Sequence, residues 1–144
     1  MTDGVTVEEV APLLRSAVLR LARRLRVERG LSALSNNKIT ILSNLAREEN
    51  GTPSRIALEE RQHLQSLTRP LAELEGAALI KRSSDPEDGR RSILNITPAG
   101  REALEADMRL RDEWLCGILA GLDTHELDTL YCAARIVDHL GTSL

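Results

Sequence analysis

Apolar positions recur every three or four residues along most of the chain, and this spacing predicts a mainly α-helical protein. The first stripe predicts a long helix that begins after the capping box Thr6–Glu9 and ends near Gly30. The apolar side chains of this stripe lie along one face of the predicted helix, which is the face that packs against another surface. They are Val10, Leu14, Val18, Leu21 and Leu25.

Two shorter helices are predicted next. Ser35 can cap a helix that runs through Arg47. Thr52-Pro53 begins another, which ends near Glu60, because proline is favoured at the first helical position. We expect Ile39, Leu42, Leu45, Ala46, Ile56 and Ala57 to face inward on these two helices.

A turn over residues 61–63 leads into a fourth helix over about 64–77. Its apolar positions follow the i, i+3, i+7, i+10 pattern of one buried stripe. Pro70 lies inside this helix and cannot donate to the Ser66 carbonyl, so we expect a kink or a shortened regular region. The stripe consists of Leu64, Leu67, Leu71 and Leu74.

The pattern then changes to two short strands, Leu79–Ser83 and Ser92–Thr97. Asp85-Pro86 and Asp88-Gly89 are turn pairs, so the segment between the strands is predicted to be an exposed hairpin loop. Its return side carries two consecutive arginines, Arg90-Arg91.

Two helices are predicted after the hairpin. Thr97-Pro98 begins a long one that reaches about Gly121, and a capping box over 123–126 begins the last one. The composition agrees, because 25 leucines and 15 alanines outnumber 14 valines and isoleucines, and phenylalanine is absent.

The middle of the chain therefore has the pattern of a winged helix-turn-helix. Two helices are joined by a three-residue turn, and a basic hairpin follows directly. The predicted fold class is mainly α (α+β), with a two-stranded β-hairpin wing between N- and C-terminal helices.

This arrangement predicts contact with double-stranded DNA. A helix fits the major groove, where its N-terminal side chains meet the base edges, and arginines on a thin loop can enter the minor groove. The candidate major-groove residues are Gln65, Ser66, Thr68 and Arg69. The wing supplies Arg90 and Arg91, although either of them could instead pair locally with Asp85, Glu87 or Asp88; weaker candidates for phosphate contacts are Lys38 and Arg82.

In these segments the sequence resembles the MarR-type transcriptional regulators. The resemblance covers nearly the whole chain in element order and is most specific over residues 52–100, with the wing pattern Asp85, Asp88 and Arg90 as its strongest part. The segments that carry it are Ser66–Glu75, Leu79–Arg82, Asp85–Arg91 and Ile96–Gly100.

The resemblance implies a homodimer whose N- and C-terminal helices intertwine, so that two winged regions address a palindromic site. It implies major-groove contacts for Ser66, Thr68 and Arg69 and a minor-groove contact for Arg90. Asp88 would brace the wing by a charge-assisted bond to an arginine.

Three regions of one structural domain follow from this resemblance. They are an N-terminal dimerisation helix over 1–34, the DNA-binding region over 35–97, and C-terminal dimerisation helices over 98–144. A repressor is favoured over an activator, and a small aromatic or phenolic effector would release the DNA; the sequence does not identify the residues of its pocket.

One position departs from the family pattern. A glycine is expected just before Leu79 as a left-handed helix cap, and this chain has Ala77-Ala78 there. Either Ala78 takes a strained cap, or the helix ends at Gly76.

The net charge of −3 over 144 residues argues mildly against nucleic-acid binding, but its distribution changes that interpretation. Residues 1–97 carry 15 basic and 13 acidic side chains, whereas residues 98–144 carry 4 and 9. The acidity therefore belongs to the C-terminal helices, and the DNA-reading region is only locally basic.

Other function classes lack their sequence signals. No apolar run is long enough to span a membrane and no secretory leader is visible, so a cytoplasmic protein without a membrane partner is expected. No metal-ligand spacing, cofactor motif or catalytic set stands out, so we expect neither an enzyme nor a bound cofactor or metal. Cys116 and Cys132 are expected to be buried apolar residues. A winged helix used only for protein contacts, as an antirepressor or assembly module, stays open as the alternative.

Overall fold

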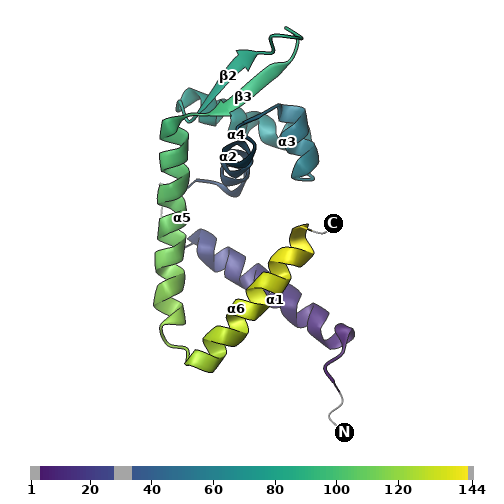
Figure 1. Ribbon diagram of the computed structural model, residues 1–144, viewed down its shortest axis with the longest axis vertical. Coiled ribbons are helices and arrows are strands. Elements are labelled where there is room, and N and C mark those ends of the chain that lie inside the picture. The colour runs from purple at the N-terminus through teal and green to yellow at the C-terminus, as the bar shows by residue number, and fades with distance from the viewer. Residues whose placement is uncertain (1–3, 28–33, 143–144) are drawn as a thin grey trace. The chain divides into compact units, whose positions relative to one another are not determined.

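The computed structural model describes residues 4–27 and 34–142, so the helix end predicted near Gly30 lies outside the described residues. The chain divides into two compact units, residues 1–110 and 111–144. The described residues form six helices and three short strands (Figure 1). In chain order these are α1 (Val7–Val27), α2 (Asn36–Glu48), β1 (Asn50–Gly51), α3 (Pro53–Glu59), α4 (Leu64–Gly76), β2 (Ile80–Ser84), β3 (Ser92–Ile96), α5 (Pro98–Leu119) and α6 (Thr124–Thr142).

The predicted helix starts are confirmed by their hydrogen bonds. In the box before α1, the Thr6 amide donates to Glu9 Oε2 at 2.9 Å and the Glu9 amide donates to Thr6 Oγ1 at 3.3 Å. Ser35 Oγ and Thr52 Oγ1 each accept from the amide three residues later, at 3.4 and 3.2 Å. These side chains satisfy amides that have no partner inside the helix.

The core of the first unit lies between α2, α3, α4 and the sheet. The predicted burial is confirmed for Leu42, Leu45, Ile56, Ala57 and three of the four α4 leucines. The fourth, Leu64, is 47% exposed, because the first turn of α4 projects beyond the core. On α2, Ile41 is buried and Ile39 is only half-buried. The buried apolar residues are Ile41, Leu42, Leu45, Ile56, Ala57, Leu67, Leu71, Leu74, Ile80 and Leu94.

The sheet has one strand more than predicted. β1 pairs antiparallel with β3, which also pairs with β2, so the strand order is β1-β3-β2. The register places Asn50 opposite Asn95 and Ile80 opposite Ile96. Asn95 Nδ2 also donates to the Glu49 carbonyl at 3.1 Å, which holds the end of α2 against the central strand.

Two helices of the first unit end in the same hydrogen-bonded motif. At the end of α4, the Ala78 amide donates to the Glu75 carbonyl and the Leu79 amide donates to the Leu74 carbonyl, with Ala78 at φ 57°. This is a Schellman motif, whose left-handed position is usually glycine. Both expected alternatives hold, because α4 ends at Gly76 and Ala78 takes the left-handed conformation.

The turn between α3 and α4 repeats this motif. Arg61 has φ 49°, its amide donates to the Leu58 carbonyl, and the Gln62 amide donates to the Ala57 carbonyl. The turn of the helix-turn-helix is therefore closed by main-chain bonds. α4 itself continues unbroken through Pro70, so the predicted shortening does not occur.

The start of α5 lies against the end of α4. Thr97 Oγ1 donates to the Ala78 carbonyl at 2.7 Å and accepts from the Gly100 amide at 3.0 Å. Gly100 is buried, and a Cβ atom placed on it would lie 2.0 Å from the Leu79 carbonyl oxygen. Only glycine therefore fits where these two backbones meet.

The helices outside this core expose many of their apolar side chains. No described residue of α1 is buried, and Val10, Val18 and Leu21 are each more than two-fifths exposed. In the second unit the box before α6 is formed, with the Glu126 amide donating to Asp123 Oδ1 at 2.8 Å. No helix among the described residues is both long and apolar enough to cross a membrane.

The predicted burial of the two cysteines is wrong for the single chain. Cys116 on α5 and Cys132 on α6 are both exposed free thiols. Both cysteines lie on helices, as the spacing of apolar residues predicts. Most residues of these helices over 111–141 are exposed, and the two thiols are exposed with them.

Candidate nucleic-acid interface

The outer face of α4 presents the predicted recognition residues. Gln65, Ser66, Thr68 and Arg69 are all exposed on its first two turns. The buried leucines at 67, 71 and 74 fix which face of the helix points outward. In this structure the Thr68 hydroxyl donates back to the Leu64 carbonyl at 3.3 Å.

Arg69 and Lys38 share one carboxylate. Arg69 Nε donates to Glu73 Oε1 at 2.8 Å, and Lys38 Nζ lies 2.9 Å from Glu73 Oε2. Lys38 is on α2, so this contact also joins α2 to the recognition helix. The pKa of Glu73 is lowered, first by the hydrogen bond from Lys38 and then by that from Arg69, and the pKa of Arg69 is raised by the same contact with Glu73.

The wing loop is closed by its backbone and its acidic side chains. The Asp85 amide donates to the Arg91 carbonyl at 3.0 Å, and the Arg91 amide donates to the Asp88 carbonyl at 2.9 Å. Asp85 Oδ1 accepts from the Glu87 amide and Asp88 Oδ1 accepts from the Arg90 amide, at 2.9 and 3.1 Å. The carboxylates therefore hold main-chain groups of the turn.

This wing geometry differs from the expected local pairing. Asp88 bonds to the Arg90 amide where an arginine side chain was predicted. Across the described ranges, neither Arg90 nor Arg91 forms an ion pair. Both guanidinium groups are exposed and can contact DNA without first breaking a protein contact.

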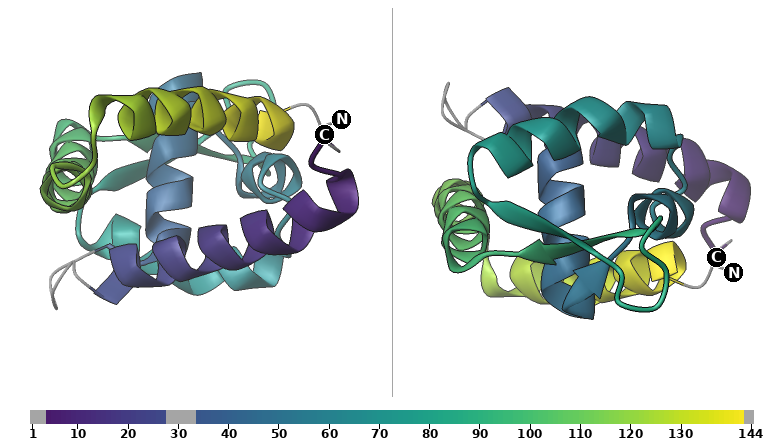
Figure 2. Two further views of the ribbon diagram at one scale, coloured as in Figure 1. Left: turned by 90° about the horizontal axis from the view of Figure 1, so that it is seen from below. Right: turned by 90° about the horizontal axis from the view of Figure 1, so that it is seen from above.

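A groove gathers the basic residues of the wing beside the helix-turn-helix. It has a volume of about 310 Å³ and lies between the starts of α3 and α4 and the loop end of the hairpin. Figure 2 (right) shows β2, β3 and α3 together from above. The residues that line the groove are Thr52, Pro53, Ser54, Leu64, Arg82, Arg90, Arg91 and Ser92.

The candidate residues thus form two groups. Arg82, Arg90 and Arg91 meet at the groove, whereas Lys38 and Arg69 meet at Glu73. Arg82 is also held, because its Nε lies 3.1 Å from Glu75 Oε2 at the end of α4.

Sequence reasoning missed three participants. The i, i+4 spacing of Arg69 and Glu73 is a known helix pairing and could have indicated Glu73. The Arg82–Glu75 contact joins a helix to a strand, and no local spacing indicates it. Ser54 reaches the groove only because α3 folds back beside the wing, so no local signal indicates it either.

Together these parts define a winged helix-turn-helix DNA-binding module. A family model described as "MarR family" matches residues 34–92. An uncharacterized helix-turn-helix transcriptional regulator of Mycobacterium bovis is 36% identical over 121 residues, which cover 84% of this chain and 85% of that protein. The chain belongs to the MarR family, whose members are DNA-binding transcriptional regulators.

Solved structures agree with this assignment. A crystal structure of a Pseudomonas aeruginosa protein, described as a transcriptional regulator, matches with a TM-score of 0.80 and 32% identity and covers 96% of this chain and 99% of that one. A structure of BpsR from Bordetella bronchiseptica matches with a TM-score of 0.67 and 20% identity, covering 90% and 98%. Its description concerns regulation of DNA binding by 6-hydroxynicotinic acid.

Proposed function

We propose that this chain is a homodimeric repressor that binds a palindromic operator through two winged helix-turn-helix regions and is released by a small aromatic effector. The observation that carries the DNA-binding part is the groove, because it combines three arginines of the wing with the starts of α3 and α4. Its arginines suit a phosphate backbone or a narrow minor groove, while the exposed face of α4 suits the major groove.

The proposed roles follow the geometry. The residues that read the major groove are Gln65, Ser66, Thr68 and Arg69. Arg90 enters the minor groove, and Arg91 contacts the DNA beside it. Asp88 supports the wing through the Arg90 amide. Lys38 and Arg82 contact phosphates more weakly, because a carboxylate lies beside each of them.

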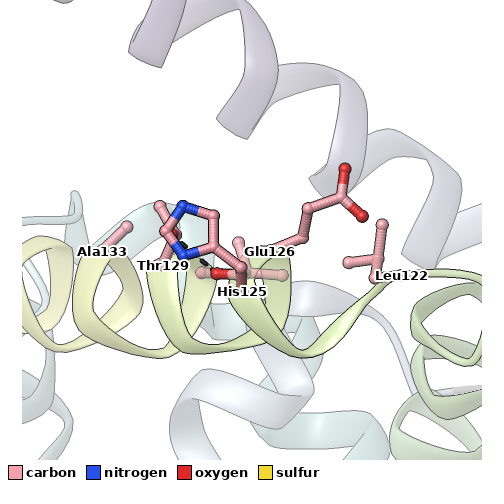
Figure 3. Close-up of a pocket in the computed structure, with 6 residues that line it drawn as sticks. Leu122, His125, Glu126, Thr129 and Ala133 are labelled. Carbon is pink, nitrogen blue, oxygen red and sulfur yellow. Dashed lines mark hydrogen bonds between the residues drawn. The ribbon is translucent and has the colours of Figure 1, made fainter.

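The dimer is supported by the apolar surface that the single chain leaves exposed. On α6 a shallow hollow of about 470 Å³ runs along the helix (Figure 3), and it is lined by Leu122, His125, Glu126, Thr129, Leu130 and Ala133. Further along α6, Ile136 and Leu140 are more than half exposed. Large exposed apolar patches mark interaction surfaces, and a second copy would cover them.

The effector is proposed from the family and from the regulated relative described above. Effector binding would change the spacing of the two recognition helices of the dimer, which are proposed to address sites about one helical turn apart, roughly 34 Å. An aromatic acid that bound one spacing better than the other would shift the protein away from the DNA-bound form.

One experiment tests the DNA part of this proposal. The purified protein is used to select duplexes from a random pool, and the DNA upstream of its own gene is footprinted in parallel. We expect an enriched palindrome and a protected site that contains it. Equal binding to every duplex at low salt, with no enriched sequence, would favour the protein-interaction module instead.

The dimer and the effector are tested separately. Sedimentation should give twice the mass of the chain, and phenolic acids or oxidants are added to the gel shift in turn. Release by a phenolic acid alone supports the effector proposal, and release by oxidant alone assigns the response to the exposed thiols. A response to neither would remove effector control from the proposal.

A further inference from the structure

Glu73 places a carboxylate on the proposed DNA-reading face of α4. It lies one turn after Arg69 on α4 and binds both Arg69 and Lys38, one through each oxygen. A negative charge here repels phosphates, so its presence costs binding energy toward any DNA unless it also contributes something.

The contribution of Glu73 to folding is small. The side chains of Arg69, Glu73 and Lys38 are 89%, 41% and 26% exposed, and ion pairs that stay in contact with water add little stability. The packing of α4 rests instead on its three buried leucines. The ion pairs of Glu73 therefore matter more for DNA binding than for the stability of the fold.

The atom that Glu73 engages supplies this explanation. It binds the Nε of Arg69, and within the described part of the chain this is the one hydrogen bond of the guanidinium. The two terminal nitrogens are left facing solvent. These are the atoms that an arginine uses for a bidentate contact with guanine O6 and N7.

Nonspecific DNA binding depends on phosphate contacts and not on base contacts. On arbitrary DNA, Arg69 and Lys38 would contribute through phosphate contacts, and the Glu73 carboxylate weakens these contacts because it offsets the charge of both cations and repels a phosphate beside them. A neutral guanine edge can meet the terminal nitrogens of Arg69 without that repulsion.

We propose, on the basis of the DNA-binding function proposed above, that Glu73 is a specificity-determining positioning residue. It holds Arg69 in a base-reading orientation and keeps Lys38 and Arg69 from strengthening nonspecific binding. Glu73 thereby raises the ratio of operator affinity to nonspecific affinity without itself contacting a base.

The test compares wild-type protein with Glu73→Gln and Glu73→Asp on two probes. One probe is the duplex that the wild-type protein enriches from a random pool, and the other is a scrambled duplex of the same length, about 30 base pairs. Glu73→Gln should bind the scrambled duplex about two- to fivefold more tightly, the factor that one exposed ion pair represents. Its dependence of log affinity on log salt should steepen by about 0.9 for each additional phosphate that the protein neutralises.

Glu73→Asp separates orientation from charge. The shorter side chain keeps the charge but cannot span both cations, so scrambled-duplex affinity should stay near wild type while operator affinity falls. Glu105→Gln is the matched control, because it removes one exposed helical carboxylate that forms no ion pair among the described residues, and it should leave the affinity ratio unchanged.

Three results would overturn the proposal. One is an unchanged affinity ratio in Glu73→Gln, and another is an equal loss on both probes together with a lower melting temperature, which would make Glu73 a structural tie between α2 and α4. A wild-type protein that enriches no sequence would instead refute the proposed function, and this inference with it.

Discussion

At the scale of single residues, two of the three non-glycine residues with positive φ in the described chain flank α4. Arg61 and Ala78 hold the places where glycine would be free of strain, one on each side of α4. For an L-residue this conformation costs roughly 1–2 kcal/mol, so the orientation of α4 is maintained against a local cost.

Ala78→Gly should therefore stabilise the protein. Relief of the left-handed strain exceeds the extra chain entropy of glycine, and we expect the free energy of unfolding to rise by roughly 0.5–1 kcal/mol. Denaturant unfolding measures this. Ala77→Gly is the control, because Ala77 has φ −84° and should lose stability on the same change.

Gly100→Ala should have the opposite effect. The new methyl group would lie 2.0 Å from the Leu79 carbonyl, so either α5 or the start of β2 must move, at a cost of about 2–3 kcal/mol. Gly76→Ala meets nothing within 4 Å and should be neutral or slightly stabilising. Equal melting temperatures for the two variants would contradict the close approach at Gly100.

At the scale of elements, α4 and the wing would contact DNA through different chemistry. α4 presents polar side chains that are partly held by neighbours, whereas Arg90 and Arg91 form no ion pair among the described residues and are ready for DNA. The wing should therefore dominate the first, electrostatic encounter, and α4 should dominate the choice of sequence.

Arg90→Ala tests the wing. If Arg90 enters the minor groove, operator binding should weaken by about 1–3 kcal/mol. Fluorescence anisotropy with the selected duplex measures the loss, and Arg109→Ala, an exposed arginine of α5, should leave it unchanged. An unaltered affinity in Arg90→Ala would remove this residue from the interface.

Local signals explain which elements could be predicted. Side-chain caps and proline positions located the helix starts, because these contacts span only three residues. β1 was missed because two residues show no periodicity, and its partner Asn95 lies far along the chain. Leu64 and the two cysteines were misplaced because burial depends on how far the core reaches, which spacing along a helix does not reveal.

At the scale of the whole molecule, the charge of the chain and its proposed dimer are connected. The excess of acidic over basic side chains lies in 98–144, whereas residues 1–97, which supply every residue that lines the groove, carry a small basic excess. A single winged helix-turn-helix region is only locally basic. Strong DNA binding would therefore require the two regions of the dimer to act together.

Leu130→Glu tests this dependence. If a second copy covers the α6 hollow, a buried carboxylate should weaken dimerisation by roughly 2–4 kcal/mol. Sedimentation should show monomers, and operator affinity should fall along with the dimer. Leu58→Glu is the control, because it makes the same substitution at a leucine of α3 that is 79% exposed. This variant should remain dimeric. A dimeric Leu130→Glu would move the interface away from α6.

The strand order has a consequence for the behaviour of the protein at high concentration. β2 is an edge strand, and past Ile80 all of its residues are exposed. Such an edge can recruit a strand from another molecule, and charged side chains on it oppose this. Lys81 and Arg82 lie on that edge, so the charges that suit a DNA surface also protect the wing from forming sheets between molecules.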